Sequence, residues 1–255
     1  MPRAIAKELG PDRFVLGRQL GSLEKLTHEG LRLTFKTSSG GTAEVVADCV
    51  VLALPFSVLR DIDISNAGFD TLKLKAIQEL GRGRNGKTQL QFQQRTWNQV
   101  GTWPGIGNGD TYSDTGYQSS WEVTRAQKGV SGILNFFSGG SVTEKMETTQ
   151  SFTSSGNPQA QKDAKAALAA GEVVFPTLTR QWNGKLTQSI PHLNPFMRAS
   201  YAYYRVGQYS SFGGYEGAAQ GQVYFAGDHC SQDFQGYMEG AASEGERAAD
   251  EVLKH

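Results

Sequence analysis

Short runs rich in Val, Leu, Phe and Thr occur along the first quarter of the chain and predict strands. The runs cover residues 13–16, 21–26, 31–36 and 44–54. A turn of serines and glycines at 38–41 separates the last two, so we expect a β-meander. The alternation in 31–36 predicts one solvated face. Residues 49–54 are apolar throughout, as in a strand buried on both faces.

Other segments repeat their apolar residues at helical spacing. Residues 4–9 resemble the end of a helix closed by a Gly-Pro pair, and residues 159–170 form an alanine-rich helix. Residues 71–80 also have a helical period, with an expected buried face of Leu72, Leu74, Ile77 and Leu80. Near the C-terminus, an apolar strand at 223–226 precedes a polar loop and a helix that starts near Gly236. The pattern predicts a mixed α and β protein.

Composition narrows the class of protein. A chain of 255 residues is long enough for one large or two modest domains. The 25 Lys and Arg balance 25 Asp and Glu, so we expect neither a nucleic-acid partner nor a membrane partner. No apolar run is long enough to span a bilayer, and the first residues lack the apolar core of a secretory signal. Two cysteines, Cys49 and Cys230, are too few for a disulfide framework, so we expect a cytoplasmic location.

Several familiar site patterns are absent or misleading. Residues 81–86 match the Gly-x-Gly-x-x-Gly spacing of dinucleotide-binding loops, but they follow a predicted helix and precede a predicted strand, the reverse of the order that phosphate binding needs. No Gly-x-Ser-x-Gly motif supports a serine hydrolase. The four histidines stand singly at 28, 192, 229 and 255, so we expect no metal site.

The most informative segment is 223–249, a predicted strand, loop and helix. The helix carries small residues on one expected packing side, namely Gly240, Ala241, Gly245, Ala248 and Ala249. Small residues allow close backbone approach, and the first-turn amides form an anion-binding helix end. This arrangement suits a large phosphate-bearing cofactor. Over about twenty-five positions the segment resembles the C-terminal cofactor segment of the flavin-containing amine oxidases, the family of monoamine, polyamine and L-amino-acid oxidases.

The resemblance implies an α/β fold with two domains. Residues 1–72 and 191–255 would form part of an FAD/NAD(P)-binding domain of the glutathione-reductase type, and residues 73–190 a mixed-sheet substrate domain. Members of this family begin with a glycine-rich phosphate loop and an acidic ribose-binding residue, and neither is present in this chain. We therefore expect an incomplete cofactor domain that needs a missing N-terminal segment or a partner chain.

The resemblance also implies where FAD binds. Asp228 would lie at the ribityl and pyrophosphate part of FAD, and main-chain amides at the start of the helix would lie by the pyrimidine end of the flavin. An amide and a positive helix end there would stabilise negative charge on the reduced flavin. Ser200 stands where mitochondrial monoamine oxidases carry the cysteine bonded to flavin, so we expect non-covalent FAD. The implied cofactor-binding residues are Leu20, Trp182, Gly227, Asp228, Gly236, Tyr237 and Met238.

Three residues match catalytic positions of the family. Lys87 resembles the lysine that contacts flavin N5 through water, where an ammonium group could assist the reduction of oxygen. Tyr201 and Tyr237 resemble the paired tyrosines that face each other across the substrate and favour the neutral amine.

The resemblance implies FAD-dependent oxidation of an amine or amino acid to an imine, with oxygen reduced to hydrogen peroxide. The expected partners are then a small-molecule amine and oxygen. An amino-acid substrate would need a carboxylate-binding arginine, for which Arg198 and Arg205 are candidates. Two alternatives stay open: a desaturase or porphyrinogen oxidase that uses the same cofactor domain, and a catalytically silent flavoprotein fragment that acts as an interaction subunit.

Overall fold

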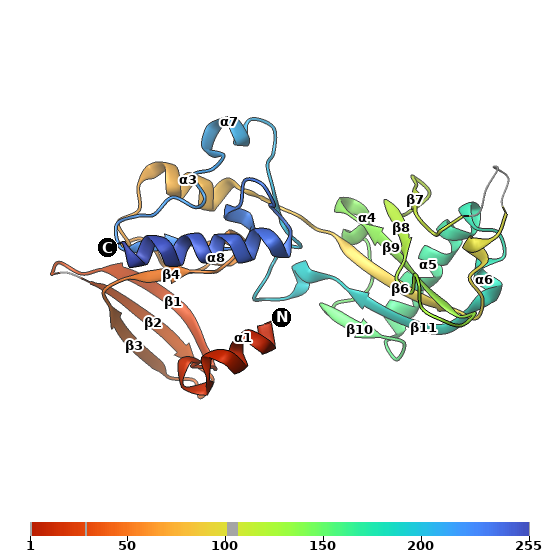
Figure 1. Cartoon of the computed structure of the whole chain (residues 1–255), viewed down its shortest axis with the longest axis horizontal. Coiled ribbons are helices and arrows are strands. Elements are labelled where there is room, and N and C mark those ends of the chain that lie inside the picture. The colour runs from red at the N-terminus through yellow and green to blue at the C-terminus, as the bar shows by residue number, and fades with distance from the viewer. Residues whose placement is uncertain (1, 29, 101–106, 255) are drawn as a thin grey trace. The chain divides into compact units, whose positions relative to one another are not determined.

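A computed structural model describes residues 2–28, 30–100 and 107–254. The chain divides into two compact units, each described by itself below (Figure 1). Unit 1 consists of the two stretches 1–80 and 204–255, and unit 2 consists of residues 81–203. The sequence placed the corresponding boundaries at 72/73 and 190/191. Residues 98–140 alternate aromatic residues with Gly, Ser, Asp and Asn, a pattern that predicts a loop-rich sheet. This prediction falls partly on residues 101–106, which lie outside the described residues.

Unit 1 opens with a helix and an antiparallel meander. Helix α1 (Pro2–Leu9) ends before the Gly-Pro pair, as predicted, and a 3-10 turn, η1 (Pro11–Arg13), follows. The sheet has the order β1-β2-β3, formed by β1 (Arg18–Lys25), β2 (Leu31–Thr37) and β3 (Thr42–Ala47). The meander is therefore confirmed. The predicted strand at 13–16 is wrong. Arg13 ends η1, and residues 14–16 are exposed and pair with no strand among the described residues.

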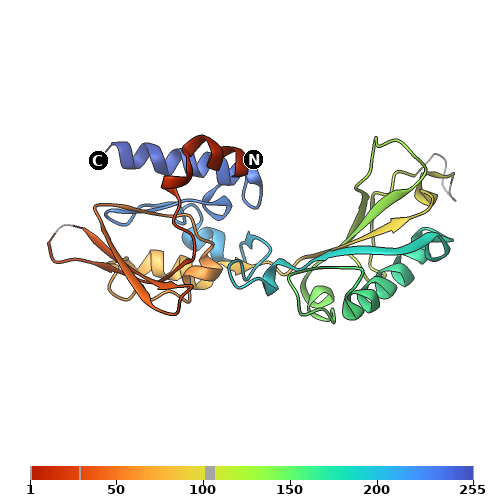
Figure 2. The same ribbon diagram turned by 90° about the horizontal axis from the view of Figure 1, so that it is seen from below.

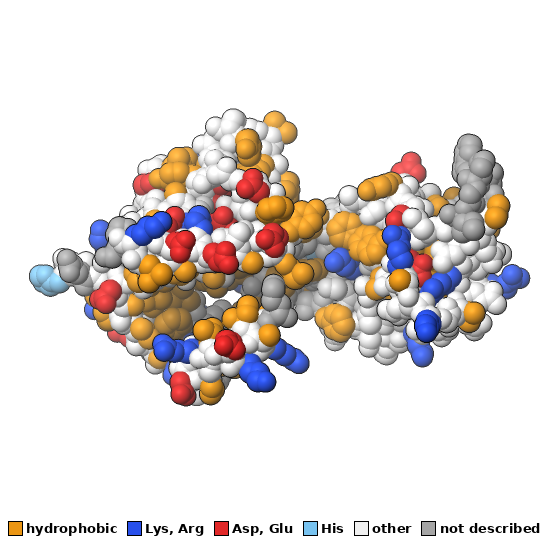
Figure 3. All heavy atoms as spheres, viewed as in Figure 1, with side chains coloured by type: hydrophobic (Ala, Val, Ile, Leu, Met, Phe, Trp, Pro, Cys, Tyr) orange, Lys and Arg blue, Asp and Glu red, His pale blue; other side chains and the backbone are white. Residues whose placement is uncertain are grey.

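The predicted strand 44–54 is in fact two strands in different sheets. Its first part is β3, which pairs with β2, and its second part is β4 (Val50–Leu52), which pairs in parallel with β13 (Val223–Phe225). The chain has to turn between β3 and β4 because their partners, β2 and β13, lie in different sheets. Val51 is 42% exposed and Cys49 is half-buried, so burial on both faces is wrong for this chain. Figure 3 shows apolar side chains gathered over this part of unit 1.

Helices cover the parallel pair of unit 1. The 3-10 turn η4 (Asp228–Cys230) connects β13 to α8 (Met238–Leu253), which packs on both. The first stretch adds α2 (Phe56–Leu59) and α3 (Thr71–Glu79), and the second adds α7 (Gln208–Phe212). The solvent face of α8 is acidic, as the line of acidic side chains over this helix in Figure 3 shows. The predicted terminal strand, loop and helix are thus confirmed.

Helix α3 buries a different face from the one predicted. Its start is fixed by Asp70, whose carboxylate accepts a hydrogen bond from the Lys73 amide at 2.8 Å. Ile77 and Leu80 are buried as expected, but Leu72 and Leu74 are partly exposed. Lys73 takes their place in the interior with no exposed surface. The burial of a lysine indicates partners elsewhere in unit 1.

Unit 2 is built on a six-stranded antiparallel sheet with the order β10-β11-β6-β9-β8-β7. The strands are β6 (Gly86–Phe92), β7 (Thr111–Tyr112), β8 (Ser119–Glu122), β9 (Gly132–Ser138), β10 (Phe152–Ser154) and β11 (Trp182–Ser189). A short ribbon of β5 (Gly81–Arg82) and β12 (Ala202–Tyr203) precedes and follows the sheet in sequence. The glycines at 81–86 therefore lie between helix α3 and strand β6, which confirms the predicted order of helix, loop and strand.

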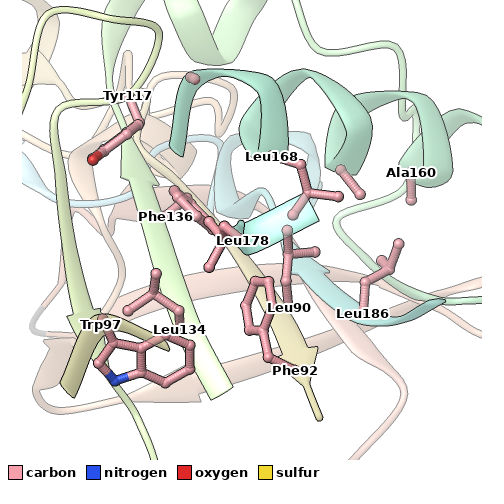
Figure 4. Packing of buried hydrophobic residues seen from close by; sticks show 12 residues of the cluster. Leu90, Phe92, Trp97, Tyr117, Leu134, Phe136, Ala160, Leu168, Leu178 and Leu186 are labelled. Atoms are coloured by element: carbon pink, nitrogen blue, oxygen red, sulfur yellow. The ribbon is translucent and has the colours of Figure 1, made fainter. Parts of the chain in front are cut away.

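One face of this sheet packs against α5 (Pro158–Val174), which lies along one side of the strands (Figures 2 and 4). Asn157 caps the helix by accepting from the Ala160 amide at 2.9 Å. The predicted alanine-rich helix is confirmed and is longer than expected. Leu90, Phe92, Leu134 and Phe136 point toward the helix and form the centre of the core (Figure 4). Short turns complete the unit: η2 (Thr96–Asn98), α4 (Gly140–Glu144), α6 (Leu178–Gln181) and η3 (Pro191–Leu193).

Two glycines of α8 should respond to the same substitution in opposite ways. A Cβ atom on Gly240 would collide with the carbonyl oxygen of Phe234, whereas one on Gly245 would meet no atom within 4 Å. Gly240→Ala should therefore lower the free energy of unfolding by about 1–3 kcal/mol. Gly245→Ala should raise it by about 0.5–1 kcal/mol because alanine favours the helix.

Urea unfolding of the two variants against the parent chain checks this prediction. Equal effects would mean that Gly240 is not needed for close packing. The predicted packing side of α8 is correct for Gly240 and Ala248, which are buried, and wrong for Ala241, Gly245 and Ala249, which are exposed. The two variants compare one residue of each kind.

Candidate functional site

The start of α8 is an exposed helix end without a side-chain cap. Gly236 has φ +83°, a value that favours glycine, and Tyr237 follows as the N-cap residue with no capping hydrogen bond from its side chain. Tyr237 and Met238 are 71% and 77% exposed. The first amides of α8 therefore combine the positive end of a sixteen-residue helix with access from outside.

The turn after β13 lies next to this helix start, since the Gly236 amide interacts with the Asp228 carboxyl. Gly227 has φ +134°, and a Cβ atom there would lie 2.8 Å from Nδ1 of His229, so the turn requires glycine. Burial raises the pKa of the half-buried Asp228 carboxyl, and the main-chain amides of Gly236 and His229 partly offset that effect. The structure thus brings Gly227 and Asp228 together with the start of α8.

Beneath this turn lies a histidine held in its neutral form. His229 is 4% exposed, and its ring packs on Phe56 with ring centroids 4.6 Å apart. Burial, together with the charge of Lys73, lowers the pKa of His229 to about 4. The neighbouring Cys230 is also buried, and burial raises the pKa of its thiol to about 12, which leaves it protonated and unreactive.

Lys73 joins the two stretches of unit 1. Its Nζ donates to the carbonyl oxygens of Tyr215 and Glu216, both at 2.7 Å, and lies 3.9 Å from the centroid of the Phe225 ring. Burial lowers the pKa of Lys73 to about 8. Since Phe225 is the last residue of β13, Lys73 is a positioning residue for the turn that carries Asp228.

The Lys73 contacts extend to a buried acid. Glu216 has no exposed surface, and burial raises the pKa of its carboxyl. Burial and the Glu216 carboxyl raise the pKa of Tyr204 as well. Neither Lys73 nor Glu216 is among the residues predicted from the sequence. The available signal was the spacing of Lys73 from Ala76, Ile77 and Leu80, which is that of one helix face.

Unit 2 contains Lys87 and Trp182 at opposite ends of one strand pair. Lys87 is an exposed residue of β6, opposite Phe137 on β9 and Ser189 on β11. Trp182 pairs with Phe92 at the far end of β6, about 17 Å away at the usual rise of a strand. The Trp182 ring packs on the core that α5 covers, and its Nε1 donates to the Lys185 carbonyl at 3.1 Å. The structure does not bring these two residues together, and the contacts of Trp182 favour a packing role.

The remaining predicted residues are distributed over both units. Tyr201 is 38% exposed, and its carbonyl accepts from the Gly83 amide at 2.8 Å. Ser200 donates from its hydroxyl to Oδ1 of Asn85 at 2.9 Å. Leu20 lies on β1 opposite Phe35, next to a β-bulge. Leu20, Gly227, Asp228 and the start of α8 thus belong to unit 1, whereas Lys87, Trp182 and Tyr201 belong to unit 2. Their roles stay predictions.

Among the described residues, no three His, Cys, Asp or Glu side chains come together as a possible metal site. His255 lies outside the described residues. No helix in the described part of the chain has both the length and the apolar character needed to cross a bilayer.

Acid should destabilise unit 1 through His229. Its folded pKa of about 4 lies below the ordinary value of 6.5, so the unfolded chain takes up a proton first as the pH falls. The stability contribution is complete above pH 6.5 and is lost as the pH falls toward 4, about 3 kcal/mol in all at 1.36 kcal/mol per pKa unit. His229→Gln, measured by urea unfolding across this range, should flatten the pH dependence. The exposed His28→Gln is the control, and an unchanged slope in His229→Gln would contradict the prediction.

Removing the Lys73 ammonium should loosen the same unit. Lys73→Met leaves a buried and a part-buried carbonyl oxygen without their donor, so we expect a loss of about 2–4 kcal/mol in the free energy of unfolding. Lys75→Met, on the exposed side of the same helix, should change it by less than about 0.5 kcal/mol. Similar losses in the two variants would show that the buried contacts of Lys73 do not join the stretches.

Solved structures of known proteins share this fold. A similar solved structure is cyclohexylamine oxidase from Brevibacterium oxydans IH-35A, with a TM-score of 0.78, 20% identity, and coverage of 98% of this chain and 51% of that one. Another is wild-type putrescine oxidase bound to putrescine, with a TM-score of 0.76, 17% identity and the same two coverages. At these identities the likeness shows the fold, an α/β arrangement with mixed sheets.

The chain spans about half the length of these solved structures. The family profile described as flavin containing amine oxidoreductase matches residues 1–253, which is nearly the whole chain. The chain therefore belongs to the flavin-containing amine oxidoreductase family.

Proposed function

We propose that this chain supplies part of the FAD site and the substrate sheet of an amine oxidase. The reaction is the oxidation of an amine or amino acid to an imine, with oxygen reduced to hydrogen peroxide. The observation that carries the proposal is the uncapped, exposed start of α8 beside Gly227 and Asp228. It occurs in a chain whose family is defined by a flavin.

The residues at the start of α8 suit the pyrimidine end of a flavin. Amides at a positive helix end stabilise negative charge on a bound group, and glycine at Gly236 leaves room for a flat ring system to approach. FAD, when bound, supplies the redox chemistry by accepting a hydride from the carbon next to the amine nitrogen. Ser200 carries a hydroxyl group, which is hydrogen-bonded to Asn85, and not the thiol that a covalent bond to flavin would need. This supports non-covalent FAD.

Unit 1 would then be an incomplete cofactor domain of the glutathione-reductase type, and unit 2 the substrate domain. The parallel pair β4–β13 supports an additional partner, because each of its strands has one unpaired edge in the described part of the chain. Val51 on that pair is also exposed. We propose that a further segment or a partner chain pairs there and supplies the pyrophosphate cradle.

Three side chains would act on the substrate and on oxygen. Lys87 would hold a water molecule and place positive charge where oxygen is reduced. Tyr201 and Tyr237 would pack on the substrate and exclude water, which favours the neutral amine that can release a hydride. The amine substrates named for cyclohexylamine oxidase and putrescine oxidase support an amine as the substrate here.

Lys87→Met tests the assignment of the lysine. The protein is purified as expressed from its own gene, with any chain that co-purifies, and is supplied with FAD. Reoxidation of the reduced flavin by oxygen should slow at least tenfold because the positive charge is lost, about 1.4 kcal/mol or more of barrier. The visible spectrum of bound FAD should stay unchanged. Lys185→Met, an exposed lysine of the same sheet, is the matched control.

The outcomes separate the parts of the proposal. Unchanged oxygen kinetics in Lys87→Met would remove the lysine from the mechanism. Protein that binds FAD but forms no peroxide with any amine or amino acid would contradict the function itself. A product with a new carbon–carbon double bond would instead identify a desaturase.

A further inference from the structure

The face of the unit 2 sheet opposite α5 is not covered by any helix in the described part of the chain. We call it the polar face. On β6 the buried residues point to α5, and Lys87, Gln89 and Gln91 alternate to the polar face. The strand register places one row of residues across it, in the order Thr187, Gln89, Asn135 and Trp121. A hydrogen bond from Thr187 Oγ1 to Gln89 Oε1 at 3.0 Å agrees with this register.

Asn135 is the residue of this row that lacks partners. Its side chain has no exposed surface, and neither Nδ2 nor Oδ1 has a hydrogen-bond partner. The large majority of buried side-chain polar atoms in proteins have a hydrogen-bond partner, so a carboxamide with both functions free indicates a missing ligand or water. The group can donate and accept at once, which matches a hydroxyl or an amide.

Two aromatic rings flank this carboxamide. Trp121 lies opposite Asn135 across the strand pair, and Phe137 lies two residues further along β9. The two rings contact each other, with centroids 5.7 Å apart and planes tilted by 48°. Both are half-buried, so they present an apolar surface next to the carboxamide. Asn135 itself has no exposed surface, so a ligand that bonds its carboxamide has to displace part of this aromatic surface.

The polar face also lacks negative charge. The acidic residue on the described parts of β6, β8, β9 and β11 is Glu122, which points to the core side. There it pairs with Arg95 at 3.0 Å and accepts from Trp97 Nε1 at 3.0 Å. The nearby charge on the polar face is positive, from Lys87, which lies opposite Phe137. A second ammonium group on a substrate would therefore find no counter-charge on this sheet.

We propose that Asn135 is a specificity-determining residue for a monoamine with an aromatic body and a neutral hydrogen-bonding group at its far end. Trp121 and Phe137 pack on the aromatic body, and the Asn135 carboxamide bonds the far group, such as a phenol hydroxyl. The inference rests on the proposed function, because it places the substrate on unit 2. It disfavours diamines as substrates.

Binding to the 255-residue chain tests this without any need for turnover. The probes are 4-hydroxyphenethylamine, phenethylamine and 1,4-diaminobutane, titrated into ¹⁵N-labelled protein. The side-chain NH2 signal of Asn135, assigned by its loss in Asn135→Leu, should shift with the hydroxylated amine. That amine should bind about tenfold more tightly than phenethylamine, and Asn135→Leu should abolish the difference. Trp121→Ala should weaken both aromatic amines by the same factor, whereas Asn183→Leu, an exposed asparagine of β11, should change neither.

Equal binding of the two aromatic amines, tighter binding of the diamine, or no binding of any probe would overturn the inference. The proposed function fails separately. Asn135-dependent binding without amine oxidation by the FAD-loaded protein would support the binding site and contradict the proposed enzyme activity. Oxidation of both aromatic amines at equal rates by the parent and Asn135→Leu would support the activity and contradict the role of Asn135.

Discussion

Unit 1 depends on the contact between two stretches of chain that are far apart in sequence. The parallel pairing of Val50–Leu52 with Val223–Phe225 is the backbone part of that contact. Lys73 is the side-chain part, since its ammonium group bonds two carbonyls of the second stretch and lies over Phe225. Asp70 adds a bond from the Tyr215 hydroxyl at 2.5 Å. Without this junction, the turn at Gly227 and the start of α8 would have no fixed position relative to β4.

The interior around this junction disfavours charge. Burial lowers the pKa of Lys73 and of His229, and it raises the pKa of Glu216, Asp228 and Cys230. All five shifts favour the neutral form, which is the effect of a poorly solvated environment. In such surroundings, hydrogen bonds and helix-end amides act more strongly than in water. The start of α8 therefore lies next to a poorly solvated interior, which weakens the positive potential of the helix end less than water does.

The sequence predicted the elements whose apolar spacing and turn residues lie close together along the chain. The meander, α3, α5 and the strand-loop-helix at the C-terminus all follow from apolar periods and turn residues within a few positions of each other. The division of residues 44–54 into β3 and β4 could not be predicted in this way, because it depends on pairing with β13 about 170 residues later. Burial of Lys73 has the same cause, since its partners are Tyr215 and Glu216. At the candidate site, the sequence led to Asp228 and the start of α8 but missed Asn135, whose free carboxamide is visible only once its strand neighbours are placed.

The central claim is that this chain builds the flavin-facing end of an FAD site at the start of α8. The most direct measurement is the visible absorbance spectrum of the protein, purified with any chain that accompanies it, mixed with FAD and then desalted. The account predicts flavin bands that stay with the protein, and loss of these bands in Gly236→Val, because valine does not favour φ +83°. A protein that is colourless after desalting, or a Gly236→Val variant that keeps FAD equally well, would contradict it.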